Sequence, residues 1–376
     1  MSSDLLDRLQ LIRTPSIGPI AIRQLLLRFG SASAALSAIP DLARRGGGKS
    51  PAIFPRASAE REMAAVEALG ARYLSLGQGL YPRALAELEN APPLIVAKGR
   101  VELLDRPMVA IVGARNASAA ACRFARGLAH DLGREGTTIV SGLARGIDSA
   151  VHDGSLDSGT IAVIAGGIDV VYPPENQARQ ADISARGLLL AEMPLGTEPR
   201  ARHFPYRNRI IAGLAAGTVV VEAAPRSGSL ITARLAAEAG REVMAVPGSP
   251  LDPRAQGCNG LIRDGATLIQ NAADVLEALT PIAGRFASRH TPFDYEPAPL
   301  EAVHAEAEPD LRAAVESLLG PSPVAVDEIV RQSGALAGAS AGAVQLVLLE
   351  LDLAGRLDRH AGGKVSLALT HHHSAS

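Results

Sequence analysis

The sequence predicts an α/β protein, in which a parallel sheet covered by helices on both faces lies between two smaller, mainly helical segments. Two observations support this prediction. From residue 101 to about 280, short apolar runs alternate with stretches of helical periodicity, which is typical of a doubly covered parallel sheet. On either side of that region, most apolar residues recur at helical spacing.

The bulk composition is that of a globular chain with room for several domains. Its 376 residues are enough for two or three domains, and 47% of them are hydrophobic. The sequence has no run of about 18 apolar residues and no signal peptide at its start, so we expect a cytoplasmic protein without membrane contact. Its two cysteines, Cys122 and Cys258, fit core packing in a reducing compartment.

The basic residues are unusual in kind. The formal net charge is −2, so a surface that binds a polyanion must concentrate its positive charge locally. Only Lys49, Lys98 and Lys364 are lysines, and the other 34 of the 37 basic residues are arginines. Genomic base composition explains most of this bias. Nearly every basic contact is nevertheless made by a planar guanidinium that can also stack.

Residues 1 to 75 form the first predicted domain, a group of short helices. In the segment LIRTPSIGPIAIRQLLLRFGSASAAL, apolar residues at helical spacing flank a Pro-Ser-Ile-Gly-Pro break. This pattern is typical of a SAM-like or helix-hairpin-helix module, whose hairpin amides can bind a DNA phosphate. A purely structural helical domain is favoured, because Gly18 lies between two prolines and few amides are free.

The second predicted domain, residues 76 to 280, begins with an extended connection up to residue 100 and continues as alternating strands and helices. The predicted strands are Met108–Val112, Thr138–Ser141, Thr160–Ala165, Leu188–Ala191, Thr218–Val221, Glu242–Val246 and Ala266–Ile269. Nearly every strand is followed by small or polar residues. Because ligands bind beyond the carboxyl ends of parallel strands, we expect these loops to line one binding edge.

The loop after the first of these strands reads Gly-Ala-Arg-Asn-Ala-Ser. Gly113 permits close approach of the backbone, Ser118 can cap the following helix, and Arg115 supplies a positive charge. Such a loop can hold an anion at a helix N-terminus, but Arg115 stands where a dinucleotide-binding loop would have glycine. The arginine therefore favours nucleic acid or a nucleotide over a redox cofactor.

The loop after the second strand reads Ser-Gly-Leu-Ala-Arg-Gly-Ile-Asp. Ser141, Gly142 and Gly146 suit a tight turn that binds phosphate before a helix. Asp148 and His152 could form a general acid–base pair, or they could complement the helix dipole and pack on a helix face. Because no nucleophile and no set of metal ligands accompanies them, we expect no catalytic residue, no metal and no cofactor.

The segment PRARHFPYRNRIIAG combines positive charge with aromatic rings, in a chain with only 3% aromatic residues. Proteins bind single strands through rings that stack on bases and cations that follow the phosphates. We therefore expect DNA contacts from Arg200, Arg202 and Phe204. For a second group, DNA contacts and buried structural hydrogen bonds are both open: Arg207, Asn208 and Arg209.

A fourth loop, Ser227-Gly228-Ser229, opens a helix directly after a strand. The backbone amides of such a turn can cradle a phosphate, although an ordinary helix cap has the same pattern. The segment lacks the Gly-Lys-Ser/Thr sequence of a P-loop. We therefore predict phosphate contact without ATP hydrolysis.

The third predicted domain, residues 310 to 370, follows a linker over residues 281 to 309 that is rich in Pro, Ala, Glu and His. Three amphipathic helices and a hairpin with Gly362-Gly363 at its turn make a winged-helix pattern. The candidate recognition helix, residues 341 to 354, lacks Lys and Arg and carries Glu350 and Asp352, which would repel phosphates. We expect a module that contacts protein or regulates.

The order and spacing of seven motifs resemble the DNA-processing protein A (DprA or Smf) family. The motifs are VGARNAS at 112–118, SGLARGID at 141–148, AGGIDVVYPPEN at 165–176, FPYRNRIIAGL at 204–214, EAAPRSGSLITA at 222–233, VPGS at 246–249 and GCNGLIRDGA at 257–266. The resemblance implies an extended Rossmann-like domain that binds single-stranded DNA without marked sequence preference. It also extends the candidate DNA-binding set to Gly166 and Gly167 of the third motif.

The resemblance further implies a protein that protects incoming DNA and loads the RecA recombinase during natural transformation. Such proteins form homodimers through the Rossmann-like domain and have no accepted catalytic activity, and single-strand-binding protein is a further partner to consider. Carried over residue by residue, the DNA-contacting arginine is Arg115 and the stacking aromatic is Phe204. The resemblance also implies a basic residue a few positions before that aromatic. This chain has Ala201 at about that place, between Arg200 and Arg202, and either arginine can supply the charge.

Two alternatives are a nucleotide-binding sensor and an enzyme similar to the lysine-decarboxylase-like phosphoribohydrolases. Those enzymes use a Pro-Gly-Gly-x-Gly-Thr-x-x-Glu loop. If Gly228-Ser229 is set against its Gly-Thr, the position of the catalytic acid falls on Thr232. Without that carboxylate the reaction has no evident acid or base. NAD-dependent oxidation is disfavoured further, because Gly-x-Gly-x-x-Gly and its distal acid are absent from the sequence.

Overall fold

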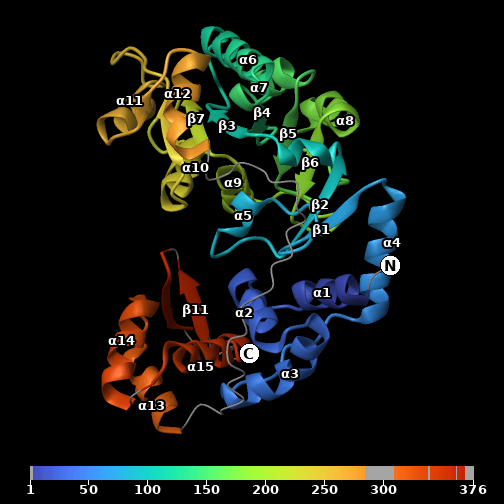
Figure 1. Cartoon of the computed structure of the whole chain (residues 1–376), viewed down its shortest axis with the longest axis vertical. Helices are drawn as coiled ribbons and strands as arrows, with labels where there is room; N and C mark the ends of the chain where they lie inside the picture. Colours follow the sequence, from blue (N-terminus) through green and yellow to red (C-terminus); the bar gives the residue numbers. More distant parts are fainter. Residues whose placement is uncertain (1–2, 284–308, 338, 361, 369–376) are drawn as a thin grey trace, which may run out of the picture. The chain divides into compact units, whose positions relative to one another are not determined.

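The structure, a computed structural model, describes residues 3–283, 309–337, 339–360 and 362–368. The predicted linker lies almost wholly outside these residues, as does the chain from 369 onward. The described residues form two compact units (Figure 1). The first joins the residues up to Met63 to those from 309 onward, and the second runs from Ala64 to Ala283.

The second unit contains a nine-stranded sheet in the order β1-β2-β6-β5-β4-β3-β7-β8-β9. The strands from β3 to β9 are all parallel to one another, which confirms the predicted parallel sheet. Their bounds lie within two residues of the predicted ones. They are β3 (Met108–Gly113), β4 (Thr138–Ser141), β5 (Thr160–Ile164), β6 (Leu188–Ala191), β7 (Gly217–Val221), β8 (Glu242–Ala245) and β9 (Thr267–Leu268).

Two further strands correct the predictions for residues 1–75, which were expected to be helical, and for residues 76–100. That stretch is not only a connection, because it contains β2 (Leu94–Gly99), which pairs antiparallel with β6 and with β1 (Arg72–Ser75). The pairing supplies hydrogen-bond partners to β6, which would otherwise be an exposed edge of the sheet. The two prolines before Leu94 concealed this strand in the sequence.

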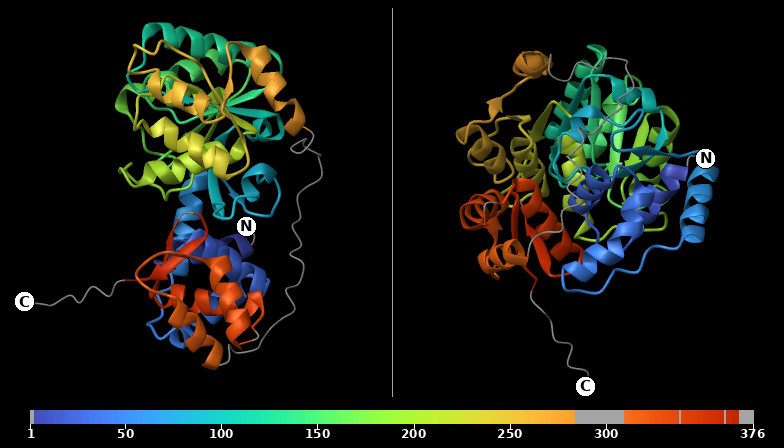
Figure 2. Two further views of the ribbon diagram at one scale, coloured as in Figure 1. Left: turned by 90° about the vertical axis from the view of Figure 1, so that its left-hand side faces the viewer. Right: turned by 60° about the horizontal axis from the view of Figure 1, so that its bottom comes forward.

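Helices cover both faces of the sheet (Figure 2). Residues of β3 alternate between the two layers, since Val109 and Ile111 pack against one and Ala110 and Val112 against the other. One layer is made of α6 (Ala119–Arg134), α7 (Ile147–Ser155), α8 (Gln177–Arg186) and α12 (Ala272–Ala283). The other is made of α5 (Arg83–Ala86), α9 (His203–Leu214) and α10 (Gly228–Glu238). The remaining elements of this unit are η1 (Val101–Asp105), η2 (Pro174–Asn176) and α11 (Gln256–Arg263).

The strand order reverses at β3, and this reversal places the functional edge. From β3 the chain proceeds through β4, β5 and β6 on one side, then returns to β7 on the other side of β3. In open parallel sheets the crevice for ligands lies at this switch point, beyond the carboxyl ends of the strands. This rule puts the crevice between the loops that follow β3 and β7, whereas the cavity described below is lined by the loops after β3, β4 and β5.

The first unit contains an N-terminal helical domain and a winged-helix domain, as predicted. The N-terminal helices are α1 (Ser3–Arg13), α2 (Pro19–Phe29), α3 (Ala32–Arg45) and α4 (Arg56–Ala68). The winged-helix elements are α13 (Pro309–Leu318), β10 (Val324–Ala325), α14 (Val326–Ala337), α15 (Ala341–Leu353), β11 (Leu357–His360) and β12 (Lys364–Leu367). Gly362 and Gly363 turn the β11–β12 hairpin with φ of 74° and 63°, a backbone conformation that favours glycine.

Helix α15, the predicted recognition helix, is buried on two sides. Leu346, Leu349 and Leu353 pack among the side chains of α2 and α3, whereas Val347 and Leu348 pack in the winged-helix core. The approach is close, since a Cβ on Gly46 would lie 2.0 Å from a backbone oxygen of α15. This helix therefore belongs to the cores of both domains.

The two acids of α15 do not form the open acidic face that the sequence suggested. Glu350 is fully buried, forms an ion pair with Arg45 Nε at 3.2 Å and accepts a hydrogen bond from Arg312. Asp352 is paired with Arg359 at 2.6 Å. Their carboxylates thus have partners within the first unit, because burial requires compensation of each charge.

His152 of α7 is part of the core beside the sheet. The ring is 1% exposed, and its Nδ1 lies 2.7 Å from the hydroxyl of Thr160 on β5. Burial lowers the pKa of His152 to about 3, so the ring is neutral at physiological pH. Asp148 has different partners, Arg207 and the amide of Ala144. The acid–base pair that the sequence left open is therefore not formed.

Leu349→Ala should destabilise both domains of the first unit. Truncating a buried leucine costs about 2–5 kcal/mol, and this side chain is 2% exposed among the N-terminal helices. We expect faster amide hydrogen exchange in α3 as well as in α15. In the matched control Leu348→Ala, whose side chain lies in the winged-helix core, α3 should keep its protection. Unchanged exchange of α3 in Leu349→Ala would contradict a shared core.

His152 should make the fold acid-sensitive. Its pKa is about 3 in the folded protein and about 6.5 in the unfolded chain, so between these values only the unfolded chain binds the proton. Stability therefore falls as the pH falls, by about 2 kcal/mol between pH 8 and pH 5. Urea unfolding at both pH values measures this loss. His152→Gln removes the titrating group, so its loss of unfolding free energy between pH 8 and pH 5 should be smaller by about 2 kcal/mol. An equal loss in both proteins would contradict the lowered pKa of His152.

Candidate nucleic-acid interface

A cavity of about 260 Å³ opens at the carboxyl edge of the sheet. Its walls come from segments far apart in the sequence: the loops after β3, β4 and β5, the turn before η2, and the first turns of α9. The side chains that matter for the argument are Arg115, Arg145, Tyr172, Phe204 and Arg207. Three of these five are cations and two are aromatic, as a site for a nucleotide chain requires.

Phe204 lies at the centre of this group. The guanidinium carbon of Arg115 is 4.9 Å from the centroid of its ring, and that of Arg207 is 5.8 Å away. Both distances are within the range of a cation–π contact. The ring of Tyr172 lies 6.0 Å from that of Phe204 at an angle of 56°. The two rings and two guanidinium groups thus present adjacent faces to the cavity.

The two arginines beside Phe204 differ in their electrostatic state. Arg115 is exposed and makes no ion pair with any residue that the structure describes. Arg207 is 7% exposed, and its Nη1 lies 3.7 Å from Oδ2 of the buried Asp148. Burial raises the pKa of Asp148 and lowers the pKa of Arg207, so each depends on the charge of the other. Arg115 therefore carries the charge that is available to a ligand.

Three of the predicted glycines make room for this arrangement. A Cβ on Gly142 would lie 1.1 Å from Nη1 of Arg207, so any side chain there would displace the arginine. A Cβ on Gly113 would lie 1.9 Å from the carbonyl oxygen of Val221 on β7. Gly146 adopts a φ of 74° against the carbonyl of Ala114. These glycines shape the cavity by their lack of a side chain.

Ser118 and Ser141 were predicted to contact DNA, and the structure gives both hydroxyls other roles. Ser118 caps α6 by accepting from the amide of Ala121 (3.0 Å), and it donates to the carboxylate of Glu222 at 2.6 Å. Ser141 is fully buried and donates to the carbonyl of Ile111 at 2.7 Å. Both hydroxyl groups therefore hold the loops, and a DNA contact at these two positions stays a prediction.

Of the three residues left open on α9, two are structural. Arg209 is 5% exposed, and its guanidinium donates to both carboxylate oxygens of Glu192, at 2.6 and 2.9 Å. Asn208 is 8% exposed, with its amide 3.5 Å from the carbonyl of Gly228. Arg207 alone among the three lines the cavity. Helical geometry separates them, because consecutive residues point in different directions.

The remaining predicted residues lie around the cavity or support it. Arg200 and Arg202 are exposed on the turn that precedes Phe204. Gly166 lines the cavity, and the amide of Gly167 donates to the carbonyl of Thr197 at 2.9 Å.

The Ser227-Gly228-Ser229 turn is an ordinary helix start rather than a wall of the cavity. Ser227 caps α10, accepting from the amide of Ser229 at 3.4 Å. Ser229 itself is buried, and Gly228 is exposed.

Sequence reasoning missed two residues of the cavity wall, Arg145 and Tyr172. Arg145 is exposed, with its Nε 3.5 Å from the carboxylate of Glu175. Tyr172 is 42% exposed beside Phe204. Both belong to motifs that were noted, but no local spacing brings a tyrosine 32 positions before Phe204 in the sequence next to its ring. Only the sheet topology does so.

Among the residues that the structure describes, no three His, Cys, Asp or Glu side chains gather as metal ligands would. Cys258 is buried, and burial raises the pKa of its thiol to about 11, so it is a poor nucleophile. None of the helices that the structure describes has the length and apolar character needed to span a membrane.

Three family models match the chain in the order of its domains. The model for DNA recombination-mediator protein A matches residues 72–280, the DprA-like N-terminal HHH domain matches residues 2–65, and the DprA winged helix domain matches residues 297–363. DNA processing protein DprA of Streptococcus pneumoniae is 47% identical over 194 residues, which is 51% of this chain and 68% of that protein. Protein Smf of Escherichia coli K12 is 35% identical over 320 residues, 84% of this chain and 82% of that protein.

Solved structures show the same fold. The structure of DprA from Streptococcus pneumoniae aligns with a TM-score of 0.64 at 37% identity, covering 74% of this chain and 98% of that one. DNA processing protein A from Helicobacter pylori, a protein that binds single-stranded DNA, aligns with a TM-score of 0.51 at 28% identity, over 57% of this chain and 97% of that one. With the matched models and the fold in agreement, this chain belongs to the DNA recombination-mediator protein A family.

Proposed function

We propose that this protein binds single-stranded DNA in the cavity at the carboxyl edge of the sheet, protects incoming DNA and loads RecA recombinase onto it during natural transformation. The observation that carries the DNA-binding part is the exposed guanidinium of Arg115, 4.9 Å from the ring of Phe204. The binding of single-stranded DNA by the similar Helicobacter pylori protein supports the same conclusion.

The mechanism is electrostatic attraction combined with stacking. Phosphates bind the exposed guanidinium groups of Arg115 and Arg145, and bases stack on Phe204 and Tyr172. Arg200 and Arg202 continue the positive track along the preceding turn. Duplex DNA binds less well, because paired bases cannot turn their faces toward the rings. Binding is therefore tolerant of sequence and sensitive to salt.

Membership of the family supports the remaining parts of the proposal. Two copies associate through their Rossmann-like domains and present two such cavities to one DNA strand. RecA, and single-strand-binding protein as a further partner, meet the protein on DNA in the cytoplasm. The protein acts as a mediator without catalysis or cofactor. In the phosphoribohydrolase alternative, the catalytic acid would have to stand at Thr232, a residue that is 2% exposed inside α10 and has no carboxylate.

Arg115→Ala should weaken binding to single strands of any sequence and lower the salt dependence. Loss of one phosphate contact reduces the slope of log K against log salt by about 0.7 for a single strand. Fluorescence anisotropy of labelled oligothymidine across a salt series, with a duplex for comparison, measures both quantities. The control is Arg134→Ala, an exposed arginine at the other end of α6, which should bind as wild type. A changed sequence preference with an unchanged slope would contradict this role of Arg115.

Phe204→Ala should weaken binding without changing the salt slope. Stacking contributes about 1–3 kcal/mol per base, which corresponds to a loss of about 5-fold to 150-fold in affinity. Phe204→Tyr keeps a stacking face and should retain most of the affinity. The same anisotropy titrations decide the matter. If alanine and tyrosine variants bind equally well, no base stacks on this ring.

A further inference from the structure

Asn176, the last residue of the AGGIDVVYPPEN motif, has no part in the contacts proposed so far. It ends η2 at the start of α8, and it is 3% exposed. It does not line the cavity, although its neighbour Glu175 does. A buried amide side chain requires hydrogen-bond partners for its donors and its acceptor. Those partners indicate what this residue does.

The loop after β4, residues 142–146, needs external support. Four of its residues line the cavity, Gly142, Leu143, Ala144 and Arg145. Leu143 has a φ of 56°, in the left-handed region that a branched side chain such as leucine seldom adopts. A backbone in such a conformation persists only where surrounding contacts enforce it.

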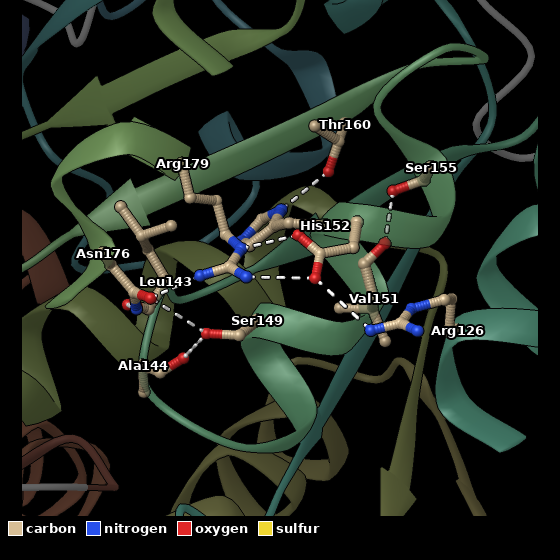
Figure 3. Close-up of polar contacts among 11 residues, drawn as sticks. Arg126, Leu143, Ala144, Ser149, Val151, His152, Ser155, Thr160, Asn176 and Arg179 are labelled. Carbon is tan, nitrogen blue, oxygen red and sulfur yellow. Dashed lines mark hydrogen bonds and ion pairs between the residues drawn. The ribbon is translucent and has the colours of Figure 1, made fainter. Parts of the chain in front are cut away.

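Asn176 supplies such a contact from behind the loop. Its Nδ2 donates to the carbonyl oxygen of Leu143 at 2.8 Å (Figure 3). Beside it, the Ser149 hydroxyl donates to the carbonyl of Ala144 at 2.8 Å. Two successive carbonyls of the strained loop thus accept hydrogen bonds from side chains that lie outside the cavity.

Arg179 fixes the orientation of the Asn176 amide. Its Nη1 donates to Oδ1 of Asn176, while its Nε and Nη2 donate to Asp153 at 2.7 and 3.0 Å (Figure 3). Since a guanidinium only donates, the oxygen of the amide must face Arg179, and the amide nitrogen must face Leu143. A series of hydrogen bonds from Asp153 through Arg179 to Asn176 therefore connects the surface of α7 and α8 to the cavity wall.

We propose that Asn176 is a positioning residue, which holds the loop after β4 in the conformation that binds single-stranded DNA. The inference rests on the proposed function. Asn176 touches no ligand and acts through Leu143. A loop held in its binding conformation before DNA arrives need not be ordered on binding, so preorganisation raises the affinity without adding a phosphate contact.

Asn176→Leu tests the proposal with a side chain of similar size and without adding a charge beside the cavity. The variant has no donor for the carbonyl of Leu143, while Arg179 keeps its hydrogen bonds to Asp153. We expect affinity for oligothymidine to fall about tenfold, with the salt slope of the wild type retained, in contrast to Arg115→Ala. Hydrogen exchange of the segment 141–148, measured without DNA, should become faster.

Asp153→Asn is the matched control. It weakens the ion pair of Arg179 at the surface, where Asp153 is 35% exposed, and it leaves the hydrogen bond from Asn176 to Leu143 in place. We expect affinity within about twofold of wild type and unchanged exchange of the loop. Thermal unfolding of both variants shows whether any loss of binding reflects loss of the fold instead.

The outcomes separate the inference from the function on which it rests. Faster loop exchange with weaker binding at an unchanged slope supports it. Unchanged exchange in Asn176→Leu, or faster exchange with wild-type affinity, overturns it while leaving the proposed function standing. If the wild type itself fails to bind single strands, the proposed function fails and the inference fails with it. A reduced salt slope in Asn176→Leu would mean a direct phosphate contact and would also overturn a positioning role.

Discussion

The buried ion pair between Asp148 and Arg207 is the constraint on which the binding edge depends. It joins the start of α7 to the first turns of α9, two elements on opposite faces of the sheet. Each partner is at least nine-tenths buried, so removing either would leave an uncompensated charge in the core. The pair places Arg207 beneath Phe204, and Phe204 in turn lies beneath Arg115. Gly142 is required at this point because the guanidinium occupies the space of a Cβ.

Around this pair, the residues of the edge divide into those that face the cavity and those that hold the loops. Arg115 and Tyr172 are exposed and face the cavity with Phe204. Glu222 holds the loop after β3 by accepting from the amide and the hydroxyl of Ser118, with a backbone φ of 49°. A rigid support of this kind is needed because a site for a flexible polyanion loses affinity whenever its own loops must be ordered on binding.

The two ends of the chain form one unit through α15. A winged-helix domain that reads DNA offers this helix to the major groove, whereas here its outer side contributes Leu346, Leu349 and Leu353 to the core of the N-terminal helices. The buried Glu350 lies between Arg45 and Arg312, one from each domain. Covered in this way, the helix makes a protein contact within its own chain, and the site that we propose for DNA lies at the edge of the parallel sheet.

The sequence by itself determined the alternation of strands and helices and the edge at which their loops converge, and it singled out Arg115 and Phe204 as candidate contacts at that edge. These are local properties, because strand periodicity, helix caps and the clustering of arginine with aromatic residues can each be recognised within a short stretch of sequence. Only the tertiary structure decided that β1 and β2 extend the sheet in antiparallel pairing. It also decided that the ring of Tyr172 lies beside that of Phe204, and that Arg209 forms an ion pair with Glu192. Each of these contacts joins segments that lie far apart in the sequence. Strand order and burial determine which distant segments meet, and the local spacing of residues does not.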